Sequence, residues 1–199
     1  MSFKALMVDV DGVVVVRPGG RRWDADMEMD LGVKPADMQA KFFDPRFHDI
    51  VRGRADLEPQ LAEALADFAP HVTARQMMDY WFAKDSRLDH QLLEDLAGYR
   101  AQGVALHLAT IQEHRRADYL WTTLKLGERF DDLHHSARYQ VAKPELAYFR
   151  AVEAQVGLSG FDLVLIDDSM NNVEGARAAG WRAVQWTGQE RLADVLAGV

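Results

Sequence analysis

Short apolar runs alternate with stretches of helical periodicity along most of this chain. The apolar runs predict strands at 3–9, 104–109, 162–167 and 182–186, with a weaker candidate at 130–135. These runs are nearly continuous in hydrophobicity, which is typical of parallel strands covered on both faces. Helical spacing predicts helices at 89–101, 113–126, 144–156 and 171–179, the third opened by Pro144 and the last closed by Gly180. The alternation predicts an α/β fold, a doubly wound parallel sheet with a Rossmann-like core.

The segment from 18 to 86 breaks this alternation. It carries helical patterns at 35–43, 57–68 and 73–83 and no convincing strand. Because it follows the first strand directly, we expect an inserted α-helical cap, with 1–17 and 87–199 forming an α/β catalytic core. The stretch 17–22, with Pro18, Gly19 and Gly20 among arginines, is expected to act as a linker.

Two carboxylates, Asp9 and Asp11, stand at the end of the first strand. Aspartate is a poor strand former, so the pair suggests a nucleophile or metal ligand beside an acid/base group. The alternative is a polar turn, since Asp11–Gly12 is a common turn pair. Thr110 and the pair Asp167–Asp168 also follow apolar runs. Ligands of open α/β sheets bind beyond the carboxyl ends of the strands, so we expect these side chains to converge there.

The converging groups have the composition of a metal-assisted phosphate site. Carboxylate oxygens are suited to a hard cation such as Mg²⁺. Thr110 and the amide groups after it, beginning with Ile111, would donate hydrogen bonds to phosphate oxygens. Lys143, just before a predicted helix, would neutralise negative charge. Taken singly, the same residues could be a strand-end threonine, a solvated lysine and a helix N-cap at Asp167–Asp168.

At these positions the chain resembles the haloacid dehalogenase superfamily of hydrolases, over residues 3 to about 186. The four motifs of that superfamily match, in order, Asp9-Val10-Asp11-Gly12-Val13, Leu108-Ala109-Thr110, Val141-Ala142-Lys143-Pro144-Glu145, and Ile166-Asp167-Asp168-Ser169-Met170-Asn171-Asn172-Val173-Glu174-Gly175-Ala176. The stretch 52–57 also resembles a turn between cap helices in the subfamily whose cap follows the first motif. Many relatives carry another aspartate where this chain has Asn172, so an anionic ligand at that position is not implied.

The resemblance implies a Mg²⁺-dependent phosphomonoester hydrolase that acts on a small phosphorylated metabolite through an aspartyl-phosphate. It implies that Asp9 is the nucleophile and that Asp11 is the acid and base. Thr110 and Ile111 would be phosphate ligands, and Lys143 would bridge the nucleophile and the phosphate. The metal ligands would be the Asp9 carboxylate, the Asp11 backbone carbonyl and Asp168, supported by Asp167. A metal would keep Asp9 ionised, while Asp11, facing the leaving group, can hold a proton.

Three other functions stay open at this point. A sugar phosphomutase would carry the same motifs and return the phosphoryl group to a sugar. A 2-haloacid dehalogenase ranks lower, because relatives that cleave carbon–halogen bonds typically lack an acid at the position of Asp11. A non-catalytic binding protein would have no need of the complete set of site residues. For a phosphatase, a sugar phosphate is the first expected substrate, followed by a nucleotide or a phosphoglycolate-like compound.

Composition limits the possible partners, the cysteine chemistry and the location of the protein. The chain has 199 residues, 48% of them apolar, a net charge of −8 and no cysteine. The acidity argues against a nucleic-acid partner, and the absence of cysteine excludes disulfides and thiolate chemistry. The first residues enter a strand without a signal peptide, and no apolar run approaches the roughly 18 residues of a membrane span. We expect a cytoplasmic monomer or homodimer whose partner is a small phosphate ester.

Several conspicuous side chains are assigned no chemistry. His107, inside a strand pattern, is expected to be packed, and the pair His134 and His135 lacks a recognisable ligand spacing. The tryptophans Trp23, Trp81 and Trp121 are expected to pack in the core or the cap. Six arginines fall in or near the expected cap, namely Arg17, Arg21, Arg22, Arg46, Arg52 and Arg54. Most should lie on a solvated surface, and one or two could face the leaving group of a substrate.

Overall fold

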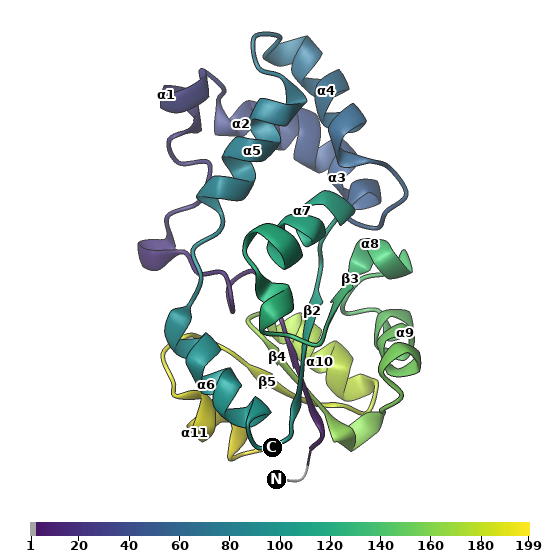
Figure 1. Cartoon of the computed structure of the whole chain (residues 1–199). Helices are drawn as coiled ribbons and strands as arrows, with labels where there is room; N and C mark the ends of the chain where they lie inside the picture. The colour runs from purple at the N-terminus through teal and green to yellow at the C-terminus, as the bar shows by residue number, and fades with distance from the viewer. Residues whose placement is uncertain (1–2) are drawn as a thin grey trace.

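A five-stranded, wholly parallel sheet forms the centre of the lower half of the molecule (Figure 1). The computed structural model describes residues 3–199. The strands are β1 (Ala5–Val8), β2 (Ala105–Thr110), β3 (Asp132–His135), β4 (Leu163–Asp167) and β5 (Arg182–Gln185). Their spatial order is β3-β2-β1-β4-β5. The doubly wound α/β fold expected from the sequence is confirmed, and so are all five predicted strands, with ends that differ from the prediction by at most two residues.

Successive residues of the central strands point to opposite faces of the sheet, and both faces are covered. Leu6 and Val8 of β1 join a cluster with α6 (His90–Arg100) and α11 (Leu192–Leu196) on one face. Met7, from the same strand, joins a cluster with α9 (Leu146–Val156) and α10 (Met170–Ala178) on the other. Burial on both faces explains why the strands are continuous apolar runs instead of alternating ones.

A second helical layer lies beyond the carboxyl ends of the strands, at the top of Figure 1. Its helices are α1 (Met27–Leu31), α2 (Pro35–Met38), η2 (Gln39–Phe43), α3 (Asp44–Ile50), α4 (Leu57–Phe68) and α5 (Ala74–Lys84). They share a hydrophobic cluster of their own, in which the rings of Trp23 and Trp81 stack with centroids 5.3 Å apart. The packing role expected for these two tryptophans is confirmed.

Two connections join this layer to the sheet. After β1 the chain turns, passes through η1 (Pro18–Gly20) and rises, and after α5 it returns through 85–89 to α6. The backbone amide of Val16 donates to the Arg87 carbonyl at 2.8 Å, and that of Asp89 donates to the Val14 carbonyl at 2.9 Å. The outgoing and returning connections are therefore bonded to each other at the point where they leave the sheet.

The helices differ from the sequence-based prediction in several places, and the short helices α8 (Ser136–Tyr139) and α11 had no predicted counterpart. The predicted helix 35–43 continues through η2 into α3, and α1 had no predicted counterpart because it is only five residues long. The helix predicted at 113–126 is α7 (His114–Asp118) followed by the π-helical turn η3 (Tyr119–Thr123), and it ends before Lys125, which adopts a positive φ of 58°. The helix predicted to open at Pro144 begins at Leu146.

The chain around Pro144 forms a tight turn that carries Lys143. The Glu145 amide donates to the Ala142 carbonyl at 2.9 Å, and the Lys143–Pro144 peptide is cis, as in type VI turns. Gly175 of α10 packs directly against this turn. A proline inside a four-residue turn cannot also start the helix, which explains the shift of the helix start to Leu146.

His107, which was predicted to be packed, is partly buried on β2, and His134 and His135 on β3 are fully and partly buried. His134 Nε2 lies 3.2 Å from His107 Nδ1, and His134 Nδ1 lies 2.7 Å from the Tyr139 hydroxyl. Burial lowers the pKa of His134 and His135 to about 4, so both rings are neutral at neutral pH. Among residues 3–199, no helix combines the length and apolar character that crossing a membrane requires.

Two glycines in helices provide a matched test of the packing of α10 against the Lys143 turn. A Cβ at Gly175 would lie 2.6 Å from the Cβ of Pro144, whereas at Gly98 of α6 no described atom outside its own helix lies within 4 Å. We expect Gly175→Ala to lower the free energy of unfolding by about 1–3 kcal/mol through overpacking. Gly98→Ala should raise it by about 0.5–1 kcal/mol, because alanine is the better helix former. Urea unfolding measures both, and equal stabilisation by the two changes would contradict this packing.

Candidate active site

Asp9 stands one residue past β1, where the sheet ends and the chain turns sharply. Its backbone amide donates to the Ile166 carbonyl at 2.9 Å, which places it level with the end of β4. The turn is closed by hydrogen bonds from the Gly12 amide to the Val15 carbonyl at 2.8 Å and from the Val15 amide to the Val10 carbonyl at 2.7 Å. The side chain of Asp9 is thereby held at the carboxyl edge of the sheet, where ligands of such folds bind.

Gly12 is required in this turn by both its conformation and its neighbour. Its φ is +83°, a region that side chains rarely adopt. A Cβ at this position would also lie 2.3 Å from Oδ2 of Asp168. The absence of a side chain at Gly12 therefore lets the Asp168 carboxylate approach the backbone that follows Asp9.

Lys143 ties three strand ends together beneath this turn. Its buried ammonium group donates to the Ala109 carbonyl at 2.6 Å and to Asp167 Oδ2 at 2.5 Å, and it lies 3.0 Å from Asp9 Oδ1. An ammonium group has three N–H donors, so these partners use its full capacity. The structure thus brings Lys143 to the predicted nucleophile, while contact of Lys143 with a phosphate stays a prediction.

Asp167 is fully buried and its oxygens already have several donors. Besides Lys143, it accepts a hydrogen bond from the Ser169 amide at 2.9 Å. Asn172 donates to both of its oxygens, at 3.0 and 3.2 Å. An aspartate at position 172 would face the Asp167 carboxylate without a proton to donate, so the amide of Asn172 suits this arrangement. These bonds make Asp167 better suited to hold Lys143 than to offer a free ligand oxygen.

Three of the predicted metal ligands are grouped tightly enough to hold one cation. Asp9, Asp167 and Asp168 each offer an oxygen, and these atoms lie within 4.8 Å of one another. Three carboxylates and one ammonium group, that of Lys143, leave a charge of −2 when all are ionised. A divalent cation with a preference for oxygen ligands fits this deficit and this donor set. The carboxylate of Asp11 is not part of the group, so a role for Asp11 at the metal through its carbonyl stays a prediction.

The pKa shifts of these groups also favour a bound cation. Burial, opposed by the charge of Lys143, raises the pKa of Asp9 to about 7. Burial also raises the pKa of Asp168, with a further contribution from Asp167. Burial alone would lower the pKa of Lys143, but Asp9 and Asp167 outweigh it and raise the pKa above its usual value. A positive charge added beside Asp9 would stabilise its ionised, nucleophilic form.

Asp11 lies on the other side of the turn, in different surroundings from Asp9. Gln112 donates to its Oδ2 at 2.6 Å, and Oδ1 has no hydrogen-bond partner among the described residues although it is buried. The nearest cation is Arg17, whose Nη2 lies 3.9 Å from Oδ1. Burial and the nearby charge of Asp85 raise the pKa of Asp11. A carboxyl group that favours the protonated form is suited to donate a proton.

A cavity of about 470 Å³ opens over these residues. Its lining includes the predicted site residues Asp9, Asp11, Thr110, Ile111, Lys143 and Asp168, together with Gly12, Arg17, Pro144, Ser169, Asn171 and Asn172. The N-terminus of α10, with Ser169 at its N-cap, also faces the cavity. A helix N-terminus attracts anions, and with the Ile111 segment it provides N–H groups where a phosphate would lie.

Several residues that shape the site had not been singled out from the sequence. Gln112 orients Asp11, and Asp85 holds Arg17 through bonds of 2.9 and 2.8 Å. The fully buried Arg116 donates to the carbonyls of Phe82 and Asp85 on the returning connection. Only Arg116 could have been noticed in the sequence, because it is a charged residue beside apolar positions in a predicted helix. The pairing of Arg17 with Asp85 spans 68 residues and leaves no trace in local sequence.

Comparison with curated proteins finds phosphatases over nearly the whole length of the chain. No sequence profile of a known protein family matches it. It is 25% identical over 194 residues to a phosphoglycolate phosphatase of Pectobacterium atrosepticum, covering 94% of this chain and 81% of that protein. It is 24% identical over 189 residues to a sesquiterpene phosphatase of Aspergillus oryzae, covering 90% of this chain and 87% of that protein.

Comparison with solved structures identifies the fold. A haloacid dehalogenase family enzyme of Bacteroides thetaiotaomicron, in complex with magnesium and inorganic phosphate, superposes with a TM-score of 0.79 at 19% identity, over 96% of this chain and 98% of that one. A predicted hydrolase of the same family from Porphyromonas gingivalis gives 0.80 at 19% identity, over 100% and 98%. The chain therefore has the fold of haloacid dehalogenase family enzymes, as the resemblance implied, with phosphatases among its sequence relatives and magnesium bound in a structural neighbour.

Magnesium should stabilise the folded protein through the grouped carboxylates of Asp9 and Asp168, with Asp167 beside them. We expect saturating Mg²⁺ to raise the melting temperature, since about 100 times the Kd of a ligand adds about 2.7 kcal/mol. Asp168→Asn should abolish most of that shift without destabilising the metal-free protein, because it removes a carboxylate that its neighbours repel. Asp79→Asn, at a side chain 71% exposed on α5, serves as the control. A full Mg²⁺ shift in Asp168→Asn would contradict this assignment.

Removing Lys143 should be costly to the fold itself. Lys143→Met would leave Asp9 and Asp167 buried without a counter-charge, and loss of one partner from a buried pair costs about 3–5 kcal/mol. Adding Asp167→Asn to the same chain should recover part of the loss, because one of the two unpaired charges is then absent. Denaturant unfolding of the single and double variants measures this, and a loss below about 1 kcal/mol for Lys143→Met would be inconsistent with the cluster described.

Proposed function

We propose that the chain, a phosphatase-type hydrolase of the haloacid dehalogenase superfamily, hydrolyses small phosphomonoesters through an aspartyl-phosphate on Asp9. The observation that supports this most strongly is the pairing of two unlike carboxyl groups at one turn. Asp9 contacts a buried ammonium group and is grouped with two further carboxylates, whereas Asp11 accepts a hydrogen bond from an amide and its nearest cation, Arg17, is 3.9 Å away. Environments that separate the pKa values and roles of two acids are typical of catalytic pairs.

Asp9 is the proposed nucleophile. Its carboxylate is held by Lys143 at 3.0 Å and faces the cavity. Attack by one of its oxygens on phosphorus would form the Asp9–phosphate bond and break the bond from phosphorus to the leaving oxygen. Magnesium, held by Asp9 and Asp168 with support from Asp167 and the Asp11 carbonyl, would offset the charge of the transferring group.

Asp11 is the proposed acid and base. The environment that raises its pKa favours the protonated carboxyl group, which can donate its proton to the departing alkoxide. The resulting carboxylate can then accept a proton from the water that attacks the phosphorus of the aspartyl-phosphate. Gln112, donating to Oδ2, fixes the orientation of the carboxyl group and leaves Oδ1 directed away from that hydrogen bond.

Phosphate oxygens are proposed to bind at the Thr110–Ile111 end of the cavity. The chain there offers the Thr110 hydroxyl, the Ile111 amide and the N-terminus of α10. Lys143 already has three acceptors, so we propose that it chiefly orients Asp9 and adds positive charge beside the phosphate. Charge compensation and positioning are the main requirements of phosphoryl transfer.

The upper helices are proposed to act as a cap inserted between 1–17 and 87–199. Arg115 of α7 bonds to Asp56 at 2.9 Å, and Arg52 lies 2.6 Å from Glu145 beside the Lys143 turn. These contacts bring the helical layer against the catalytic edge of the sheet. A layer this close favours a small metabolite, such as the sugar phosphate expected from the sequence or a phosphoglycolate-like compound. The cytoplasmic location and the monomeric or dimeric state stay predictions.

Phosphate release from a panel of sugar phosphates, nucleotides and an aryl phosphate tests the proposal. We expect release with Mg²⁺, none with chelator, and a loss of at least about 1,000-fold in Asp9→Asn because the nucleophile is gone. Asp79→Asn, at an exposed side chain of α5 that does not line the cavity, should retain full activity. Absence of release from every compound by the folded protein would contradict the proposal and favour a mutase or a binding protein.

Asp11→Asn should separate the two chemical steps. An aryl phosphate has a good leaving group and needs little protonation, so a burst of the phenol should survive the change. Steady-state turnover should fall by about 100- to 10,000-fold, because the base for the second step is missing. Stopped-flow absorbance resolves the burst from the steady state. An unchanged steady-state rate in Asp11→Asn would refute the role given to this residue.

A further inference from the structure

A second, smaller pocket lies beside the catalytic cavity, between the two connections that join the helical layer to the sheet. Its volume is about 200 Å³, and basic side chains dominate its lining: Arg17, Arg21, Arg22, Lys84 and Arg87. Trp23 and Asp26 are also among the lining residues. We call this the basic pocket. The chain as a whole has a net charge of −8, so a small space lined by five basic residues differs from the average charge of the protein.

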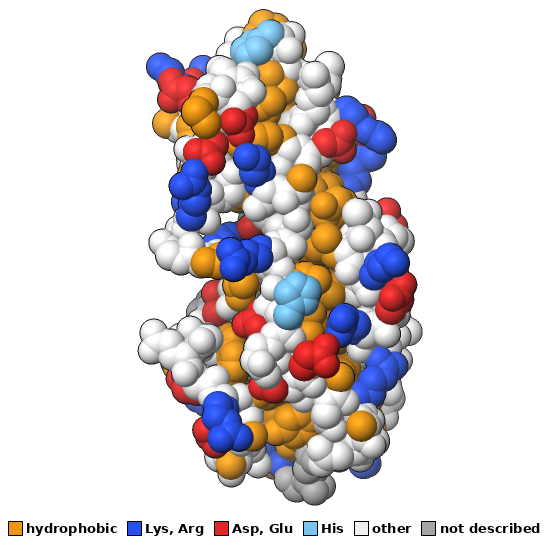
Figure 2. Space-filling model, turned by 60° about the vertical axis from the view of Figure 1, so that its left-hand side comes forward, with side chains coloured by type: hydrophobic (Ala, Val, Ile, Leu, Met, Phe, Trp, Pro, Cys, Tyr) orange, Lys and Arg blue, Asp and Glu red, His pale blue; other side chains and the backbone are white. Residues whose placement is uncertain are grey.

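Basic side chains also lie on the molecular surface around this pocket. Figure 2 shows Lys and Arg side chains gathered about a hollow on the left-hand side, between the upper and lower halves of the molecule. One carboxylate, that of Asp26, also lines the pocket, but the five basic side chains outnumber it, and an excess of positive charge in a cleft concentrates anionic ligands. The basic pocket is therefore suited to a small anion.

Two of the arginines are held in place by carboxylates behind them. Arg17 donates through Nε and Nη2 to Asp85, at 2.9 and 2.8 Å. Arg22 donates through Nε and Nη2 to Asp24, at 3.0 and 2.8 Å. Each bidentate pair fixes the plane of a guanidinium group and uses one of its edges. A guanidinium group has five N–H donors, so each arginine keeps donors on its other edge.

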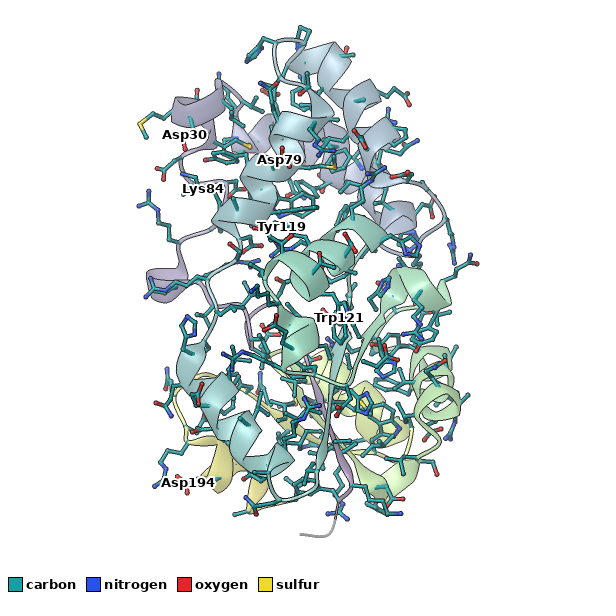
Figure 3. All side chains as sticks on the ribbon, viewed as in Figure 1. Asp30, Asp79, Lys84, Tyr119, Trp121 and Asp194 are labelled. Carbon is teal, nitrogen blue, oxygen red and sulfur yellow. The ribbon has the colours of Figure 1, made fainter. Side chains whose placement is uncertain are left out.

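The other cations complete the ring around the pocket. Lys84 of α5 bonds to Asp30 of α1 at 2.9 Å, and Figure 3 shows the two labelled side chains approaching each other from their helices. Arg21 contacts Asp26 through Nη2 alone. Arg87 is exposed, and its guanidinium group makes no ion pair within residues 3–199. Arg87 is thus the basic side chain of the pocket with its full donor capacity available.

Arg17 connects the basic pocket to the catalytic cavity. It lines both spaces, and its Nη2 lies 3.9 Å from Oδ1 of Asp11. Asp11 is the residue proposed to protonate the leaving group. The basic pocket therefore lies on the leaving-group side of the site, and a substrate with its phosphoryl group at Asp9 would extend toward it past Arg17.

From these observations we propose that the basic pocket binds a second anionic group, a carboxylate or a phosphate, carried by the leaving group of the substrate. The proposal rests on the proposed function and narrows its substrate class to phosphomonoesters with such an anion a few bonds from phosphorus. Pockets for whole small-molecule ligands are typically about 300–1,000 Å³. A pocket of about 200 Å³ suits one anionic group and not the body of a metabolite.

Binding of hydrolysis-resistant phosphonates tests this independently of turnover. Calorimetry in the presence of Mg²⁺ would compare ethylphosphonate with phosphonoacetate and methylenebisphosphonate, which add a carboxylate and a second phosphonate. We expect at least one dianionic probe to bind about tenfold or more tightly than ethylphosphonate, the order that a charge-assisted hydrogen bond provides. The tighter of the two tells a carboxylate from a phosphate.

Three variants test whether the preference for a dianionic probe arises in the basic pocket. Arg22→Gln and Arg87→Gln should each reduce the preference for the dianionic probe to less than about threefold, since each removes a donor from the pocket. Arg87 is exposed and unpaired, so its replacement leaves folding contacts intact even if Arg22→Gln is unstable. Arg75→Gln, at a side chain 74% exposed and paired only with Asp79 at 3.8 Å on α5, should keep the full preference.

The outcomes separate this inference from the proposed function. Equal binding of all three phosphonates by the unmodified protein, or an undiminished preference in both Arg22→Gln and Arg87→Gln, would overturn the inference. Mg²⁺-dependent phosphate release would stand or fall separately, because it is measured on simple esters. A preference that persists without any phosphatase activity would support the basic pocket and contradict the proposed function.

Discussion

The buried ammonium group of Lys143 is the contact on which the rest of the site depends. It joins the end of β2, through the Ala109 carbonyl, to Asp9 after β1 and Asp167 at the end of β4. Unpaired, each of these buried charges would be costly, so the cluster fixes three strand ends and the turn of Lys143 at once. The cluster still carries more negative than positive charge. The same contact that organises the fold therefore leaves a place for a divalent cation beside the nucleophile.

The site is divided into two ends that differ in electrostatics. At one end, Asp9 and Asp168 form the metal and phosphate region, which is closed by Gly12 and the N-terminus of α10. At the other, Asp11 has a neutral amide partner and Arg17 as its nearest cation. A proton donor and a nucleophile only two residues apart can thus hold different protonation states. The basic pocket extends the second end toward the connections, where the helical layer joins the sheet.

The sequence was most informative where chemistry is local. The apolar runs predicted all five strands, and the ends of those strands carried Asp9, Thr110 and Asp167, so the topology of a parallel sheet was enough to bring them together. The longer helices were predicted because their apolar faces repeat over several turns. The five-residue α1 has too few turns to show a period. Lys143 was expected in the site from its position in a loop before a predicted helix, but the tight turn that carries it, and its contacts with three strand ends, could not be predicted from local sequence.

Pairs of residues far apart in the chain could not be predicted from local sequence patterns, for a physical reason. Arg17 and Asp85 meet because the outgoing and returning connections are bonded side by side, and Arg116 reaches the same connection from α7. Such partners are selected by the assembled fold, and neither member has a distinctive neighbourhood in the chain. Gln112 shows the same limit. Its position two residues after Thr110 was visible, but its bond to Asp11, 101 residues away in the chain, required the turn after β1 to be known.

The central claim is that Asp9 carries the phosphoryl group during turnover, and chemical trapping tests it most directly. The protein would be quenched in acid while hydrolysing a phosphomonoester with Mg²⁺, and then treated with borohydride, which reduces an acyl phosphate to an alcohol. Peptide mass spectrometry should find residue 9 converted from aspartate to homoserine, with no conversion when substrate is omitted. Steady phosphate release with residue 9 unmodified, or with another carboxylate reduced in its place, would contradict the account.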